Sequence, residues 1–170
     1  MAEVGVSGHW GQDRYVLTGA GNVNKTVSSV GVAVDAKLDL PMVTVLGGAF
    51  QGENLDVWNS LVGVNQTGAA AAITAVKGIK TKGYWGQAQI TPIAGFTVLA
   101  GGGMELPKLA DLTGMAATTV KHNGQLSGGV QLNLTSKWKC ALEATRYVTH
   151  YLDDSRFEST QVELSTLYAF

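Results

Sequence analysis

Two glutamates in the last third of this sequence have the type and spacing to do chemistry. Glu143 and Glu163 lie in neighbouring segments whose polar and apolar residues alternate. If a connection of about eight residues joins these segments, the two carboxylates sit nearly opposite each other, as in an acid/base pair. Charged groups inside a protein need partners, however. We therefore favour a polar network, in which Lys139, Lys37 or another cation bridges the two glutamates and Asp35 joins them.

A second candidate lies between these two segments. His150 is followed closely by Asp153, Asp154 and Ser155, and a histidine base can activate a serine hydroxyl as a nucleophile. An exposed polar loop is the interpretation that we favour.

Other chemistry is poorly supported by the sequence. The chain has 170 residues, a formal net charge of −1 and one cysteine. These numbers exclude a disulfide framework and a cysteine-rich metal site, and they argue against nucleic acid as a partner. His9 and His122 are isolated, so we expect no metal and no cofactor.

The dominant pattern is an alternation with a period of two, which sends successive side chains to opposite faces of a strand. It is clearest in residues 125–134, and residues 43–51 are ambiguous because both faces are apolar or glycine. Most segments have about the length of a tilted membrane-spanning strand. The eight segments are residues 3–10, 29–38, 43–51, 84–90, 96–104, 125–134, 139–145 and 161–170.

The connections between segments alternate in length. Short connections are predicted at 39–41, 91–95 and 135–137, and long ones at 11–25, 52–79, 106–123 and 151–156. Short turns at one end and long loops at the other are typical of outer-membrane barrels. The apolar content of 52–79 predicts ordered packing, with a short helix as one form. We expect this loop either to plug the lumen or to cap the barrel.

Composition favours a membrane over water around the apolar face. The polar face is rich in Gln, Ser, Thr and Asn rather than in Lys and Glu, which cover soluble surfaces. The only charged residue with the parity of the apolar face is Arg146. It lies near the loop end of its segment, where its side chain can extend to the membrane surface. A soluble lipocalin-like barrel is the alternative. An aromatic girdle is predicted at Trp10, Tyr84, Phe96, Trp138, Tyr168 and Phe170.

The end of the sequence carries a resemblance. Its last nine residues resemble the C-terminal assembly signal of Gram-negative outer-membrane proteins, which the barrel-assembly machinery recognises. Thr166 is less apolar than the residue that this pattern prefers at its position. The signal residues would be Val162, Leu164, Thr166, Tyr168 and Phe170.

A second resemblance covers most of the chain. Residues 6–11, 48–56 and 83–87 resemble the C-terminal part of a porin-like family, whose members are longer. This resemblance implies a non-enzymatic channel. A small enzyme that modifies lipid A through a rim His/Ser site, and a scaffold that binds a partner through its loops, are the alternatives.

Together these observations predict an all-β protein: a single domain over residues 1–170, formed by an eight-stranded antiparallel up-and-down transmembrane barrel. Its short turns would be periplasmic, and its long loops would lie outside the outer membrane. Open edges are costly in lipid, so the sheet must close on itself, or pair with a second copy or a partner chain. The interior polar network would comprise Asp35, Lys37, Gln87, Gln131, Lys139, Glu143 and Glu163.

Overall fold

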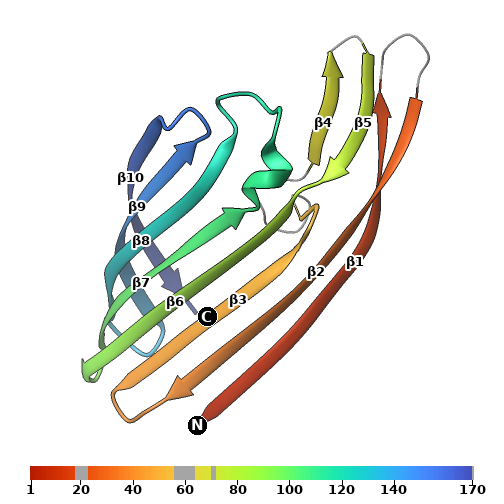
Figure 1. Cartoon of the computed structure of the whole chain (residues 1–170). Coiled ribbons are helices and arrows are strands. Elements are labelled where there is room, and N and C mark those ends of the chain that lie inside the picture. The colour runs from red at the N-terminus through yellow and green to blue at the C-terminus, as the bar shows by residue number, and fades with distance from the viewer. Residues whose placement is uncertain (18–22, 56–63, 70–71, 170) are drawn as a thin grey trace.

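The computed structural model describes residues 1–17, 23–55, 64–69 and 72–169. In this part of the chain, eight strands form one antiparallel sheet in the order β1-β2-β3-β6-β7-β8-β9-β10, and β4 and β5 form a separate hairpin (Figure 1). The elements are β1 (Ala2–Leu17), β2 (Val23–Asp39), β3 (Val43–Glu53), β4 (Val64–Ala69), β5 (Ala72–Gly78), β6 (Lys80–Ile93), β7 (Phe96–Pro107), the 3-10 helix η1 (Leu109–Leu112), β8 (Val120–Asn133), β9 (Trp138–Tyr151) and β10 (Arg156–Tyr168).

The eight antiparallel strands that the alternation predicts are confirmed. Several strands are longer than predicted. The prediction of a loop over residues 11–25 was wrong for most of that range. Gln12–Leu17 pair with Val23–Ser28 as a continuation of the β1–β2 ladder. Backbone hydrogen bonds hold this extension together, and they do not require the apolar side chains on which the prediction relied.

The sheet does not close into an eight-stranded barrel. All of β1 and β10 is described, and no ladder joins them, so each is an edge strand. Figure 1 shows the sheet as a curved wall, with the chain start on β1 at one edge and β10 at the other. The expected closure of eight strands on themselves is therefore not observed.

The long segment between β3 and β6 contains strands. Where a short helix was one expectation, residues 64–69 and 72–78 form the antiparallel pair β4–β5. This hairpin stands at the long-loop end beside β1 and β2, and β5 contacts β2 (Figure 1). Residues 56–63, which hold part of the apolar content noted in the sequence, lie outside the described residues.

Apolar side chains line the outside of the sheet. Among the described residues the buried apolar ones are Val27, Leu55, Ile79 and Leu112. In contrast, Val4 is 78% exposed and Leu164 is also 78% exposed, and similar residues follow on every strand of the sheet. Soluble monomers rarely expose a continuous apolar patch of this extent. The distribution fits a sheet whose outer face meets lipid rather than the soluble barrel.

The register shows that this outer face is continuous. Val6 pairs with Val34, which pairs with Ala49, and Ala49 pairs with Tyr84. On β2 the apolar positions run from Val30 to Leu38, about 27 Å along the strand. Because membrane strands are tilted by about 35–45°, this length approaches the roughly 25 Å apolar band of outer-membrane barrels.

A small apolar core lies at the long-loop end. Ile79, just before β6, and Leu112 of η1 are fully buried against each other, with Met115 and Leu152 packed around them. The Leu152 backbone N–H also donates to the Thr119 carbonyl at 3.0 Å, which joins neighbouring loops. Within the described residues, no helix is long and apolar enough to cross a membrane.

Placing a cation in the middle of the outer face should destabilise the protein. We expect Val34→Arg to lower the free energy of unfolding in lipid vesicles by about 2–4 kcal/mol, the cost of arginine at the bilayer midplane. Ser7→Arg is the matched control, because Ser7 pairs with the neighbouring Ala33 and belongs to the opposite face. Equilibrium urea unfolding measures both. Equal losses from the two variants would contradict a lipid-facing outer surface.

Candidate functional site

The second face of the sheet carries the polar side chains. One row crosses the sheet through Lys37, Leu46, Gln87, Gly101, Ser127, Thr145 and Gln161, each paired with the next. Neighbouring rows of the same parity contain the other residues predicted for an interior network. The structure therefore places all seven on one face: Asp35, Lys37, Gln87, Gln131, Lys139, Glu143 and Glu163.

Glu143 and Glu163 are direct partners in the β9–β10 register, as their spacing suggested. Glu143 accepts a hydrogen bond of 3.2 Å from the Thr145 hydroxyl. Among the described residues, no ion pair joins either glutamate to Lys139. Lys37 pairs instead with Asp39, at 2.8 Å. The two facing carboxylates therefore contribute negative charge to the polar face, and a bridging network stays a prediction.

Two large aromatic side chains, which alternation alone does not distinguish, also lie on this face. Phe50 covers Gly83, where a Cβ would lie within 2.5 Å of its ring, and the Trp85 indole covers Gly48 in the same way. Each ring therefore lies against a neighbouring strand, where only glycine leaves room for it. A large residue paired with glycine across two strands is the signal that could have revealed this arrangement.

Asn54 connects the end of β3 to the polar face. Its Nδ2 donates to Asp13 at 2.6 Å, its Oδ1 accepts from the Tyr15 hydroxyl at 3.2 Å, and its carbonyl accepts from Ser29 at 2.7 Å. His9 is hydrogen-bonded to the same Ser29 at 3.0 Å. Asn54 has a φ of 55°, a conformation that asparagine tolerates better than most residues.

This fully buried asparagine fixes where the segment after β3 leaves the sheet, on the polar side of β1 and β2. Sequence reasoning missed it because its partners are 25 to 41 positions away. Whether the segment plugs the lumen or caps the barrel depends on residues 56–63, outside the described part of the chain.

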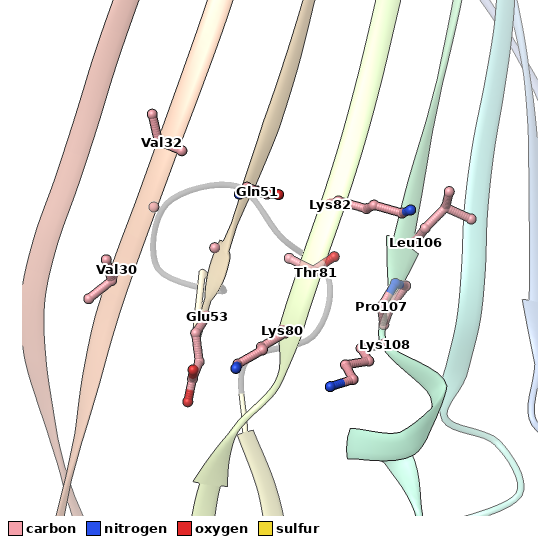
Figure 2. A pocket seen from close by; sticks show the side chains of 12 residues that line it. Val30, Val32, Gln51, Glu53, Lys80, Thr81, Lys82, Leu106, Pro107 and Lys108 are labelled. Carbon is pink, nitrogen blue, oxygen red and sulfur yellow. The ribbon is translucent and has the colours of Figure 1, made fainter.

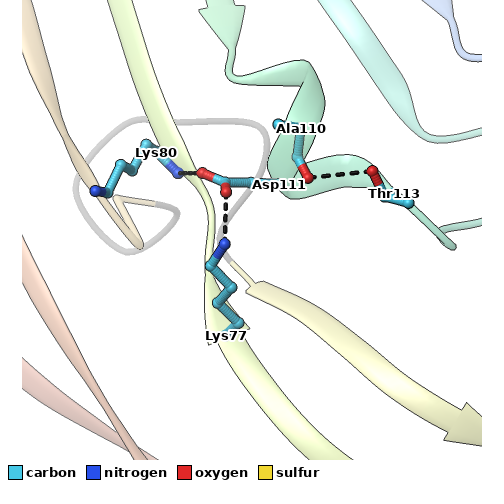
Figure 3. A network of polar contacts seen from close by, with 5 residues as sticks. All are labelled: Lys77, Lys80, Ala110, Asp111 and Thr113. Carbon is cyan, nitrogen blue, oxygen red and sulfur yellow. Dashed lines mark hydrogen bonds and ion pairs between the residues drawn. The ribbon is translucent and has the colours of Figure 1, made fainter.

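Asp111 holds the outer loops together (Figure 3). Its carboxylate is buried, pairs with the Lys77 ammonium at 2.6 Å and accepts from the Lys80 backbone N–H at 3.3 Å. These interactions join η1 to the strand junction between β5 and β6. The hydrogen bond from Lys77 lowers the pKa of Asp111 below its ordinary value; burial opposes this effect and the Lys80 amide adds to it.

The residues proposed for a rim enzyme are not brought together. The Ser155 hydroxyl donates to Asp153 at 2.5 Å, and Asp154 pairs with Lys121 at 2.6 Å. His150 stacks on His122 with ring centroids 4.3 Å apart. No hydrogen bond joins His150 to Ser155 in the described structure, so the serine has no histidine base there.

The predicted girdle residues lie on the outer face. Trp10 and Tyr84 lie toward the long loops, whereas Phe96, Trp138 and Tyr168 lie toward the short turns. Val162, Leu164 and Thr166 of the predicted assembly signal share this face on β10, and the Trp138 indole donates to Thr166 at 2.7 Å. Phe170 lies outside the described residues. The girdle and signal roles stay predictions.

The fold is similar to that of the outer membrane channel DcaP of Acinetobacter baumannii. The TM-score is 0.83 at 10% sequence identity, over 99% of this chain and 47% of that protein. This chain thus spans about half of the channel's length. No family model and no curated protein matches its sequence. The porin-like fold that the resemblance implies is supported at the level of fold, and the structure it resembles is a channel rather than an enzyme.

The Asp111 interaction predicts a pH dependence. Because the folded-state pKa of Asp111 lies below its unfolded value, the stabilisation is present above about pH 4 and is lost as the pH falls through the folded pKa. The protection factors of residues 109–115 against hydrogen exchange, which correct for the intrinsic pH dependence of the amide exchange rate, should therefore be higher at pH 7 than at pH 3. Asp111→Asn should have lower protection factors than the wild-type chain at pH 7 and should lose most of the difference between the two pH values.

Asp154→Asn is the control, because the Lys121–Asp154 pair is exposed and exposed pairs contribute little. An Asp111→Asn variant with wild-type exchange at both pH values would contradict the anchor role.

Proposed function

We propose that the chain forms part of the wall of an outer-membrane diffusion channel that is wider than an eight-stranded barrel. The observation that carries the proposal is the open sheet, apolar outside and polar inside, with two unpaired edges. Strands from outside residues 1–170, in the same or another polypeptide, would pair with β1 and β10. The similarity to about half of a known channel supports this arrangement.

The width of the completed barrel decides whether solutes or ions can pass through it. The interior of an eight-stranded barrel is just wide enough to be filled by side chains, whereas barrels of 16–18 strands leave an aqueous channel. Phe50 and Trp85 lie over glycines of adjacent strands rather than across the space in front of the sheet. This packing favours a wall that faces water over the filled interior of a narrow barrel.

The edges can be tested by cross-linking. In a Cys140→Ala background, Ser7→Cys on β1 and Ser165→Cys on β10 place thiols on the polar face of the two edge strands. Because the refolded sample offers only further copies of this chain as partners for the open edges, we expect oxidation in vesicles to give covalent dimers, together with stable conductance in planar bilayers. Cross-links within single chains and no conductance would overturn the proposal, because they describe a closed narrow barrel.

The facing glutamates should influence which ions pass. Rings of acidic side chains favour cations in pores. We expect Glu143→Gln combined with Glu163→Gln to lower the cation-to-anion permeability ratio, read from the reversal potential in a KCl gradient. Asp153→Asn with Asp154→Asn makes the same change of charge in an exposed loop and should have a smaller effect. An unchanged ratio in the glutamate variant would place these residues away from the conduction path.

A further inference from the structure

A groove with basic walls lies on the outer face of the sheet, not on the polar face. Its volume is about 670 Å³, and it lies across β2, β3, β6 and β7 at their long-loop ends (Figure 2). We call it the lysine groove. Its principal lining residues are Val30, Val32, Glu53, Lys80, Lys82 and Lys108.

The register fixes the side on which the lysines lie. Val30 pairs with Glu53, which pairs with Lys80; two positions further along, Val32 pairs with Gln51, which pairs with Lys82. Val30 and Val32 continue the apolar row of β2, so both lysines of β6 belong to the outer face. They cannot line a channel on the other side of the same sheet.

The position of the lysine groove marks a boundary. On β6, Lys82 lies two positions nearer the long loops than Tyr84 does. Lys108 lies two positions beyond Leu106 in the same direction, just after the end of β7. The Lys108 backbone N–H donates to the Lys80 carbonyl at 2.7 Å, which places the two lysine positions side by side. On β6 and β7, apolar side chains therefore end and cationic ones begin at one level, whereas Val30 and Val32 of β2 stay apolar in the same rows.

The lysines that line the groove outnumber its carboxylates. Three lysines and one glutamate line it, a balance of +2. All three lysines are exposed, and none of them forms an ion pair with a described residue; nearby Lys77, by contrast, is paired with Asp111. Figure 2 shows Lys82 extending toward Leu106, whereas Lys80 and Lys108 lie nearer the loops.

Snorkelling of each lysine into water is the simplest alternative. It would explain one cation above an apolar belt. It does not explain why three lysines without an ion pair surround one groove. Val30 and Val32 form one wall of this groove, and Glu53 and Gln51 lie between the valines and the lysines of β6. Basic pockets next to an apolar belt are suited to lipid head groups.

We propose that the lysine groove binds a phosphorylated glycolipid of the outer leaflet. Its phosphates would pair with Lys80, Lys82 and Lys108, and an acyl chain would lie along Val30 and Val32. The Glu53 carboxylate and the Gln51 amide would accept hydrogen bonds from sugar hydroxyl groups, which a simple phospholipid offers less well. The proposal rests on the membrane placement within the proposed function and does not depend on conduction.

The test uses the full chain folded in detergent micelles and lipid A as the probe, with bound lipid counted by native mass spectrometry. We expect Lys80→Gln, Lys82→Gln and Lys108→Gln together to weaken lipid A binding by at least about tenfold. Lys25→Gln, Lys121→Gln and Lys137→Gln make the same change of charge elsewhere and should weaken it less than about twofold. Lipid A without its phosphates should bind the wild-type chain as weakly as lipid A binds the groove variant.

Unchanged binding by the groove variant would overturn the proposal, and so would equal affinity of the wild-type chain for phosphatidylglycerol, which would indicate unselective charge attraction. Circular dichroism of each variant confirms that it is folded. Failure of the wild-type chain to insert into vesicles would instead contradict the proposed function itself, because the groove would then face water.

Discussion

The structure depends on one constraint, the pairing of backbone polar groups where no water can reach them. Each inner strand of the wall pairs with a neighbour on both sides, whereas β1 and β10 pair on one side only and leave a row of N–H and C=O groups unpaired. In lipid each unpaired group costs several kcal/mol, so two open edges of this length would cost on the order of tens of kcal/mol. No side-chain interaction in the described structure is of that size, and for this reason the edges dominate any account of what the wall assembles into.

Within that constraint, the alternation along each strand places apolar side chains on one face of the sheet and polar side chains on the other. The outer face keeps its apolar residues exposed, and the polar face collects carboxylates, amides and hydroxyls in continuous rows. Glycines let Phe50 and Trp85 lie against the wall. The apolar core that a soluble protein would need is confined to the long-loop end, where Ile79 and Leu112 meet. There Asp111 and Asn54 tie the loops to the strands.

The parts of this arrangement that sequence could predict are those set by a local period. Alternation predicted the eight strands, the shared face of the network residues and the facing of Glu143 and Glu163. Closure was beyond reach, because an edge strand and a central strand of a membrane wall have the same pattern of side chains. The Asn54 contacts depend on residues distant in sequence. The extensions of β1 and β2 contain polar residues at which the apolar alternation stops, so the sequence pattern does not reveal them.

The distribution of charge on the outer face gives the wall a direction. At the short-turn end, most outward positions of the strands are apolar or aromatic and none of those in the ladders is charged, as at Leu38, Ile90, Phe96 and Trp138. At the long-loop end they include the lysines of the groove and Arg146, which pairs with Glu158 at 2.5 Å. A symmetric bilayer gives no reason for cations at only one of its two interfaces. A membrane with a more anionic outer leaflet does, because each exposed cation near such a surface gains about 1 kcal/mol. The proposed placement of the long loops at the outer surface of an outer membrane would thus also account for where the outer face becomes basic.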